Sequence, residues 1–426
     1  MEFRQVVSFS FAITNYQLPI TILFVSQPLK ILQIVPSISL VYGGPSQMVL
    51  GLSEALARQG VEVTVLTTNA NGDVGQPPLN VPLNEPVSKN GYQVRYFSCS
   101  PLRRYKFSLE LLRWLWKHAP EYDVAHIHAL FSPVTTAAAW VARQRNLPYI
   151  LRPLGTLDPA DLQKKKWLKK IYAGSIESAN LSGAAAVHFT TETEARISHR
   201  FGAKTRDLVI PLGVEPYVGE PVEIDCTQLT LPSESPIVLF LSRIEPKKGL
   251  ELLIPALECL HCEGLEFHFV MAGSNAQDPE YEAKIARKIQ ASSLLQCTTF
   301  AGFVTGDAKA LLLRYADVFV LPSYYENFGI AVVEGMVAGV PVIISDRVQI
   351  ADAVEESQSG WVASCDVEAV AAALREALQN PAERRRRGAN AREYAIKYYS
   401  WDAIAEQTIQ AYRHFGMKHL DEGRSD

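Results

Sequence analysis

The feature that most constrains this chain is an alternation of short β-branched runs with longer amphipathic stretches, in two successive series. Such alternation predicts βαβ units around a buried parallel sheet, because parallel strands need crossovers that cover both faces. The first series predicts strands at 31–36, 61–67, 92–98, 124–129, 148–152, 184–189 and, at an edge, 208–210, with helices at 46–59, 108–118, 133–145, 162–180 and 191–200. The second predicts strands at 237–241, 267–272, 298–301, 318–321 and 341–344, with helices at 249–262, 279–290, 307–315, 329–338, 367–378, 382–397 and 400–415.

A segment rich in Pro, Glu, Thr and Ser separates the two series and shows no helical or strand periodicity, so we interpret it as a linker. At 426 residues the chain is also too long for one core. We therefore expect two doubly wound α/β domains, with a ligand cleft at the carboxyl ends of their strands. The expected division is an N-terminal extension at 1–29, a first domain at 30–213, a linker at 214–235, a second domain at 236–399, and a final helix within 400–426 that crosses back to the first domain.

Composition excludes several classes of function. A formal net charge of −4 provides no global field for nucleic acid. Six scattered cysteines are too few for a disulfide framework, which favours a reducing, cytoplasmic location. The apolar stretch from Val6 to Ile13 is diluted by polar residues and followed by Pro19, so we expect neither a secretory signal nor a membrane span there.

The most informative segment runs from Val318 to Glu334, where a buried strand breaks at Pro322 and a helix begins near Gly329. A helix opening presents free N–H groups and a positive dipole end, which suits a phosphate. Glu326 and Glu334 flank that opening, and they would bind hydroxyls on either side of a diphosphate, as in a nucleotide sugar. For an isolated pair of this spacing, the alternative is a loop charge and a solvated helix carboxylate.

A basic turn, Ser242 to Gly249, follows the first strand of the second series. Its Arg243 and Lys248 could neutralise a departing diphosphate, although a solvated turn is the alternative. Gly273 follows the next strand and would permit close approach of a ligand to the backbone.

The first series carries two comparable features. Gly43 and Gly44 follow its first strand, where small residues let backbone amides approach a phosphate, and where a tight turn is an equal explanation. His126 and His128 end a buried strand on one face, with His128 nearer the crevice. A structural histidine is the alternative for either one.

Together these motifs resemble the glycosyl transferases group 1 family, which are retaining glycosyltransferases of the GT-B fold, with two Rossmann-like domains facing a central cleft. The resemblance covers about residues 30–415, because five motifs occur in the family's order. It implies transfer of a sugar from a UDP- or GDP-type donor to a sugar or lipid-linked acceptor, with retention of configuration. Arg152 to Pro159 and Ser345-Asp346 are similar to a bacterial surface-polysaccharide subset, which implies polysaccharide or glycolipid assembly.

The resemblance also implies roles for individual residues. Arg243 and Lys248 would hold the diphosphate and support its departure. Glu334 would bind the ribose hydroxyls, Glu326 the sugar hydroxyls, and His128 would lie near the transferred sugar and the reaction centre. Further donor contacts are expected from Gly44, Gly273, Asn327, Phe328 and Gly329. No Asp-x-Asp motif is present, so we expect no metal and no cofactor.

Three alternatives remain open: an isomerase of the nucleotide-sugar 2-epimerase type, a catalytically silent nucleotide-sugar-binding protein, and an oxidoreductase. The last lacks a Gly-x-Gly-x-x-Gly motif after either first strand. Cys259 and Cys262 imitate half of a zinc site, but no second pair occurs. The basic run from Lys164 to Lys170, with Trp167 inside it, predicts either a peripheral contact with the inner face of a membrane or a solvated helix face.

Overall fold

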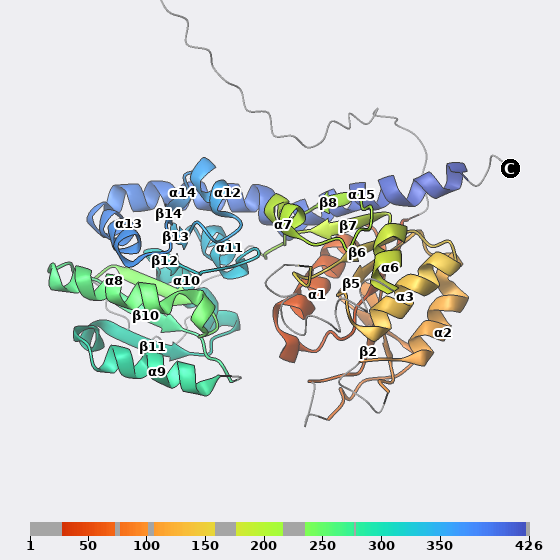
Figure 1. Cartoon of the computed structure of the whole chain (residues 1–426), viewed down its shortest axis with the longest axis horizontal. Helices are drawn as coiled ribbons and strands as arrows, with labels where there is room; N and C mark the ends of the chain where they lie inside the picture. Colours follow the sequence, from red (N-terminus) through yellow and green to blue (C-terminus); the bar gives the residue numbers. More distant parts are fainter. Residues whose placement is uncertain are drawn as a thin grey trace, which may run out of the picture.

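The computed structural model describes residues 28–72, 77–100, 106–157, 176–215, 235–276 and 278–422. Within these ranges the chain forms two α/β domains, and a long C-terminal helix lies across both (Figure 1). Most of the expected extension and linker, and the basic run from Lys164 to Lys170, fall outside the described residues.

The first domain contains an eight-stranded sheet in the order β3-β4-β2-β1-β5-β6-β7-β8. Its strands are β1 (Lys30–Ile34), β2 (Glu62–Thr68), β3 (Pro86–Lys89), β4 (Tyr92–Phe97), β5 (Val124–His128), β6 (Tyr149–Arg152), β7 (Ala186–Phe189) and β8 (Asp207–Val209). Its helices are α1 (Gly44–Arg58), α2 (Leu109–His118), α3 (Pro133–Gln144), α6 (Ser178–Gly183) and α7 (Glu192–Ile197).

Strand β3 was not predicted, and it is antiparallel to β4 in an otherwise parallel sheet. Asn90 and Gly91 join the two strands, with φ angles of 44° and 86°. An Asn-Gly pair with two positive φ angles is typical of a tight hairpin turn, so this dipeptide was the available signal. Of the helix expected at 162–180, the described part is the start of α6.

The second domain contains a parallel six-stranded sheet in the order β11-β10-β9-β12-β13-β14. Its strands are β9 (Ile237–Leu241), β10 (His268–Ala272), β11 (Thr298–Gly302), β12 (Val318–Leu321), β13 (Val342–Ser345) and β14 (Gly360–Ala363). Its helices are α8 (Leu250–Cys262), α9 (Pro279–Gln290), α10 (Gly306–Tyr315), α11 (Ile330–Val337), α12 (Ala351–Glu356), α13 (Val367–Gln379) and α14 (Pro381–Tyr399). The sequence missed α12 and β14, which have only six and four residues, too few for a periodic pattern.

Strand order explains where a ligand can bind. β1 lies between β2 and β5, and β9 lies between β10 and β12, so each sheet changes direction beside its first strand. The loops after the two strands at such a point diverge and leave a crevice at the carboxyl edge. In the first domain those are the loops after β1 and β5, and in the second they are the loops after β9 and β12.

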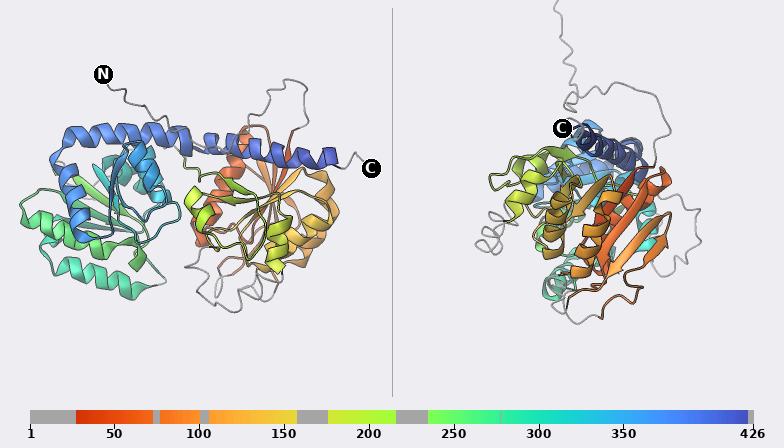
Figure 2. Two further views of the ribbon diagram at one scale, coloured as in Figure 1. Left: turned by 45° about the horizontal axis from the view of Figure 1, so that its top comes forward. Right: turned by 90° about the vertical axis from the view of Figure 1, so that its right-hand side faces the viewer.

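Helix α15 (Trp401–Glu422) crosses from the second domain to the first, where it packs on α1 and β5 (Figures 1 and 2). The ring of Trp401 packs directly against two glycines of the first domain. A Cβ atom on Gly51 would lie 2.5 Å from this ring, and one on Gly213 would lie 2.2 Å from it. The helix extends past the predicted end near residue 415. Among the helices within the described ranges, none combines the length and apolar character that a membrane span requires.

Candidate functional site

The loop between β12 and α11 carries four of the predicted site residues. Gly329 caps α11 in the left-handed region, with φ +81°, and no side chain hydrogen-bonds to the amides of the first turn. Phe328 is buried, with its ring edge-on to Tyr399 at 5.5 Å between centroids, so it anchors the loop. The opening of α11 is therefore held in place. Val332 N and Val333 N donate to Gly329 O, which leaves the amides of Ile330 and Ala331 available to an anion.

Lys248 and Glu326 form an ion pair between the loop after β9 and the loop after β12. The two loops are also joined through their backbones, because Tyr324 N donates to Lys247 O at 2.8 Å. Gly249, at φ +73°, makes this fit possible: a Cβ atom there would lie 1.9 Å from the carbonyl oxygen of Pro322. Two residues 78 positions apart in sequence are thus brought together at the crevice.

Arg243 lies on the same loop as Lys248, but its side chain is 58% exposed and only 3.3 Å from Glu245 Oε1. It is free to swing toward a ligand, because its one ion pair is solvated and therefore weak. Gly273 lies beside this loop: a Cβ atom on it would lie 1.8 Å from Ser242 O. The close approach that this glycine permits in the structure is to protein backbone, and its contact with a donor stays a prediction.

Glu334, on α11, forms an ion pair of 2.6 Å with Lys309 on α10. Both side chains are partly buried. Lys309 belongs to none of the predicted motifs. Only the ion pair with Glu334 in the folded structure identifies it as a neighbour of the site.

The two domains meet at the same place. Gly43 caps α1 with φ +66°, and a Cβ atom on Gly44 would lie 3.7 Å from Ile330 Cδ1 at the start of α11. A Cβ atom on Gly155, which follows β6, would lie 2.3 Å from Asn327 Nδ2. The structure therefore brings the glycine loop of the first domain to the helix opening of the second.

His128 lies at the end of β5 and is completely buried. Its Nε2 atom is 2.6 Å from Gln33 Oε1 on β1, and the amide of Gln33 donates to the hydroxyl of Tyr412 at 2.9 Å. That hydroxyl is 2.7 Å from Nδ1 of His126. The crossing helix α15 therefore contacts both predicted histidines, one directly and one through Gln33.

His188 is hydrogen-bonded to His126 and extends this series, which we call the histidine row. The hydrogen bond of His188 to a backbone carbonyl determines which atom donates at each step of the row. His188 Nε2 donates to the carbonyl of Ile210 at 2.8 Å, and its Nδ1 lies 3.2 Å from Nε2 of His126. Burial lowers the pKa of His188 to about 3 and lowers the pKa of His126 and His128, so all three rings are neutral. His126 Nε2 must then donate to His188, and His126 Nδ1 accepts from Tyr412.

The same bonding determines the tautomer of His128. Gln33 donates its amide to Tyr412, so its Oε1 must accept from Nε2 of His128. Nδ1 of His128 is then a bare acceptor, and within the described part of the chain it has no hydrogen-bond partner. A hydroxyl group of a ligand could donate to it. No hydrogen bond or ion pair joins His128 to the donor-side residues in the described structure.

Arg152, at the end of β6, is aligned with His128 in the sheet register and is only 4% exposed. Burial lowers its pKa to about 10, partly offset by the negative charge of Glu194. Among the described residues no carboxylate forms an ion pair with it, and its Nε has no partner. A buried cation without a partner is costly to fold, so Arg152 is a candidate site residue to which the sequence assigned no role.

The described residues hold no group of three or more His, Cys, Asp or Glu side chains that could bind a metal ion. What the described site does contain is four cations beside glycine-rich backbone and a helix opening. Arg243, Lys248 and Lys309 are each paired with a glutamate, and Arg152 is not. Such a site can bind an anionic ligand between the two domains and stabilise negative charge that develops there.

Both domains match families of known glycosyltransferases. Residues 222–394 match the family model of glycosyl transferases group 1, and residues 43–213 match that of the glycosyl transferase 4-like domain. The matches to the first curated relatives, at 32% to 34% identity, span only 42% to 44% of those proteins. A phosphatidyl-myo-inositol mannosyltransferase of Mycobacterium leprae is 28% identical over 87% of this chain and 92% of its own length.

Solved structures show the same fold over nearly the whole chain. Sucrose-phosphate synthase of Thermosynechococcus elongatus is 25% identical, with a TM-score of 0.70, over 91% of this chain and 98% of its own. HepE of Anabaena, solved in complex with UDP and glucose, is 18% identical, with a TM-score of 0.67, over 91% of this chain and 100% of its own. By these matches and its two α/β domains, the chain belongs to the glycosyl transferases group 1 family and has the GT-B fold.

Proposed function

We propose that this protein is a retaining glycosyltransferase that moves a sugar from a nucleoside-diphosphate donor to an acceptor in polysaccharide or glycolipid assembly. The observation that carries the proposal is the ion pair between Lys248 and Glu326 beside the opening of α11. It supports the proposal because a cation and a carboxylate lie together beside the start of a helix, an arrangement that suits a diphosphate with a sugar attached.

In the proposed reaction the glycosidic bond to the diphosphate breaks, and negative charge grows on the leaving group. Arg243, Lys248 and the amides of α11 stabilise that charge without a metal ion. Lys248 exchanges Glu326 for the diphosphate, and Glu326 turns to hydroxyls of the sugar. The acceptor hydroxyl attacks from the side that the diphosphate leaves and passes its proton to the departing diphosphate, so the new glycosidic bond keeps the anomeric configuration.

The donor in this proposal is a UDP or GDP sugar. The complex of HepE with UDP and glucose supports a nucleotide of this kind, at the level of a shared fold. Glu334 binds the ribose hydroxyls and releases Lys309 when the donor enters. Gly44, Gly273, Asn327, Phe328 and Gly329 supply backbone or side-chain contacts to the same donor.

The acceptor in this proposal is a sugar or lipid-linked sugar with an anionic group. Arg152 supports an anionic acceptor, because its buried charge has no described partner and lies next to His128. A relative that is named for a phosphatidylinositol substrate is consistent with this choice. If the acceptor is a lipid-linked sugar, the protein acts in the cytoplasm at the inner face of the membrane, with Lys164 to Lys170 in contact with anionic lipid.

A panel of UDP and GDP sugars tests the proposal. The true donor should raise the melting temperature, since a ligand at about 100 times its Kd stabilises a fold by about 2.7 kcal/mol. With an acceptor present, the proton NMR spectrum of the product should show the donor's anomeric configuration, and EDTA should leave the rate unchanged. Interconversion of the donor without acceptor would instead indicate an epimerase, and binding without any reaction would indicate a silent binding protein.

A further inference from the structure

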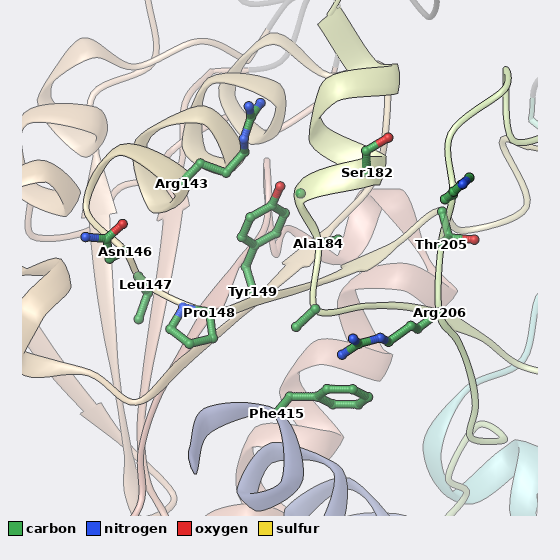
Figure 3. Close-up of a pocket in the computed structure, with 13 residues that line it drawn as sticks. Arg143, Asn146, Leu147, Pro148, Tyr149, Ser182, Ala184, Thr205, Arg206 and Phe415 are labelled. Carbon is green, nitrogen blue, oxygen red and sulfur yellow. The ribbon is translucent and has the colours of Figure 1, made fainter. Parts of the chain in front are cut away.

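A pocket lies in the first domain, at the amino ends of its last parallel strands (Figure 3). Its volume is about 780 Å³, within the range of small-molecule sites. Its walls come from the segments that precede β6, β7 and β8, together with the ends of α3 and α6 and Phe415 of α15. His128 and Arg152 lie at the carboxyl ends of β5 and β6, on the side of the crevice. The pocket lies at the amino ends of the strands, so the length of the strands separates the two sites.

Three cations line this basic pocket: Arg143, Lys204 and Arg206. Within the described structure no Asp or Glu belongs to its lining, and none of the three cations forms an ion pair. Positive charges that line one pocket without a counterion attract an anion. Arg143 lies in the last turn of α3, where a cation is favoured by the helix dipole, but Lys204 and Arg206 lie on no helix.

The remaining lining is suited to a polar anion with an apolar neighbour. Ser182 and Thr205 offer hydroxyl groups, and Figure 3 shows Arg206 beside the ring of Phe415. Gly183 leaves room for the side chain of Arg143, since a Cβ atom on this glycine would lie 2.9 Å from Arg143 Cδ. The pocket therefore combines positive charge, hydrogen-bond donors and one aromatic wall.

We propose that the basic pocket binds a phosphate group through Arg143, Lys204 and Arg206, at a site separate from the donor crevice. A phosphate group carries up to two negative charges and several acceptor oxygens, and a pocket lined by three cations and two hydroxyls offers donors and positive charge to such a group. The group can be part of a soluble phosphate ester or of a lipid headgroup. The proposal does not depend on the reaction at the crevice.

The experiment starts from a chain with Arg243→Gln and Lys248→Gln, so that the cations of the crevice do not bind the probe. Inorganic pyrophosphate is titrated into this protein by calorimetry, with and without the added changes Arg143→Gln, Lys204→Gln and Arg206→Gln. The matched control carries Lys89→Gln, Arg113→Gln and Lys117→Gln, which remove three exposed cations of the same domain. Lys204→Gln with Arg206→Gln alone is the fallback should Arg143→Gln impair folding, because both of those residues are exposed.

We expect the pocket changes to weaken pyrophosphate binding by roughly tenfold or more, and the control changes to leave it unaltered. Co-sedimentation with phosphatidylcholine vesicles, with and without phosphatidylglycerol, then identifies the source. Loss of phosphatidylglycerol-dependent binding in the pocket variant alone indicates a lipid headgroup, whereas unchanged vesicle binding indicates a soluble phosphate ester. Equal pyrophosphate affinity with and without the pocket changes, or no binding in the starting chain, would overturn the proposal.

Discussion

The hydroxyl of Tyr412 lies 2.7 Å from Nδ1 of His126, so the helix that crosses from the second domain is bonded to the end of β5 in the first. The same hydroxyl accepts from Gln33, which in turn accepts from His128. One phenol therefore determines which nitrogen of His128 carries the proton. It also couples the position of α15 to the residue that we place at the reaction centre.

Tyr412→Phe should leave the amide of Gln33 and Nδ1 of His126 without partners in a buried place. We expect a loss of about 1–3 kcal/mol in the free energy of unfolding. Because the tautomer of His128 is then free to change, the transfer rate should also fall, with the KM of the donor nearly unaltered. Urea unfolding, steady-state kinetics and nitrogen NMR of the histidine rings measure these effects. Tyr398→Phe, at a half-exposed tyrosine of α14, is the control, and identical histidine spectra in wild type and Tyr412→Phe would contradict the coupling.

Arg243→Ala should lower the turnover number by roughly 100-fold, because it removes a cation that stabilises the leaving diphosphate. The melting temperature should hardly change, since the side chain is 58% exposed and has one weak ion pair. Lys247→Ala, four residues further on, removes an exposed cation that makes a similar ion pair with Glu245. Turnover and melting of both purified variants test this, and a near-normal rate for Arg243→Ala would remove the residue from the mechanism.

The pairs Lys248–Glu326 and Tyr412–His126 show which parts of the site could be predicted from the sequence and which could not. The strand, loop and helix around Glu326 were predictable because Pro322 and Gly329 mark the ends of the loop. The partner of Glu326 was not, because Lys248 is 78 residues away and reaches it only when β9 and β12 become neighbours. Tyr412 is 286 residues from His126, on a helix without any chemical motif. The local sequence pattern thus predicted most helices and strands and the loops that carry the motifs. Contacts between elements far apart in sequence could not be predicted, because they depend on the order of the strands in the sheet.

Glu334→Gln should weaken binding of the free nucleoside diphosphate by about 1.5–3 kcal/mol, because a charged acceptor of the ribose hydroxyls is lost. The transfer rate at saturating donor should change little, since the ribose is far from the bond that breaks. Asp307→Asn removes an exposed carboxylate from α10, the helix that carries Lys309, and serves as the control. Calorimetric titration decides the matter, and equal affinities for wild type and Glu334→Gln would exclude the ribose role.

The histidine row predicts a loss of stability in mild acid. Burial lowers the pKa of His188 to about 3, and it lowers the pKa of His126 and His128, whereas an unfolded chain protonates its histidines below about pH 6.5. The stability that these neutral rings contribute is therefore fully present above about pH 6.5 and is lost as the pH falls below that value. At about pH 5.5 the lowered pKa of His188 alone should cost about 1.4 kcal/mol.

Urea unfolding at neutral pH and at about pH 5.5 measures this loss. His188→Gln keeps a donor for the carbonyl of Ile210 and removes one titrating ring, so it should reduce the loss by about 1.4 kcal/mol. The variant must be compared with wild type at both pH values, because the substitution also changes stability at neutral pH. An equal acid-induced loss in both proteins would show that His188 is not the cause.

Arg152 permits the sharpest separation of a binding role from a structural one. Its guanidinium is buried without an acidic partner in the described structure, so folding pays the desolvation of a charge and recovers little of it. Arg152→Met should therefore keep or raise the free energy of unfolding, by up to about 4 kcal/mol. Transfer to an anionic acceptor should nevertheless fall, with the affinity for the nucleoside diphosphate unchanged.

Arg384 provides the matched control, since it is equally buried but donates to the carbonyls of Ala377 and Leu378 at 2.7 Å and 2.8 Å. Arg384→Met should destabilise the fold, because those carbonyls lose their partner, and it should leave acceptor affinity alone. Urea unfolding and acceptor KM for both variants complete the comparison. A large destabilisation by Arg152→Met would assign the residue a structural role, because an unpaired cation that supports only ligand binding contributes nothing to the folded state in its absence.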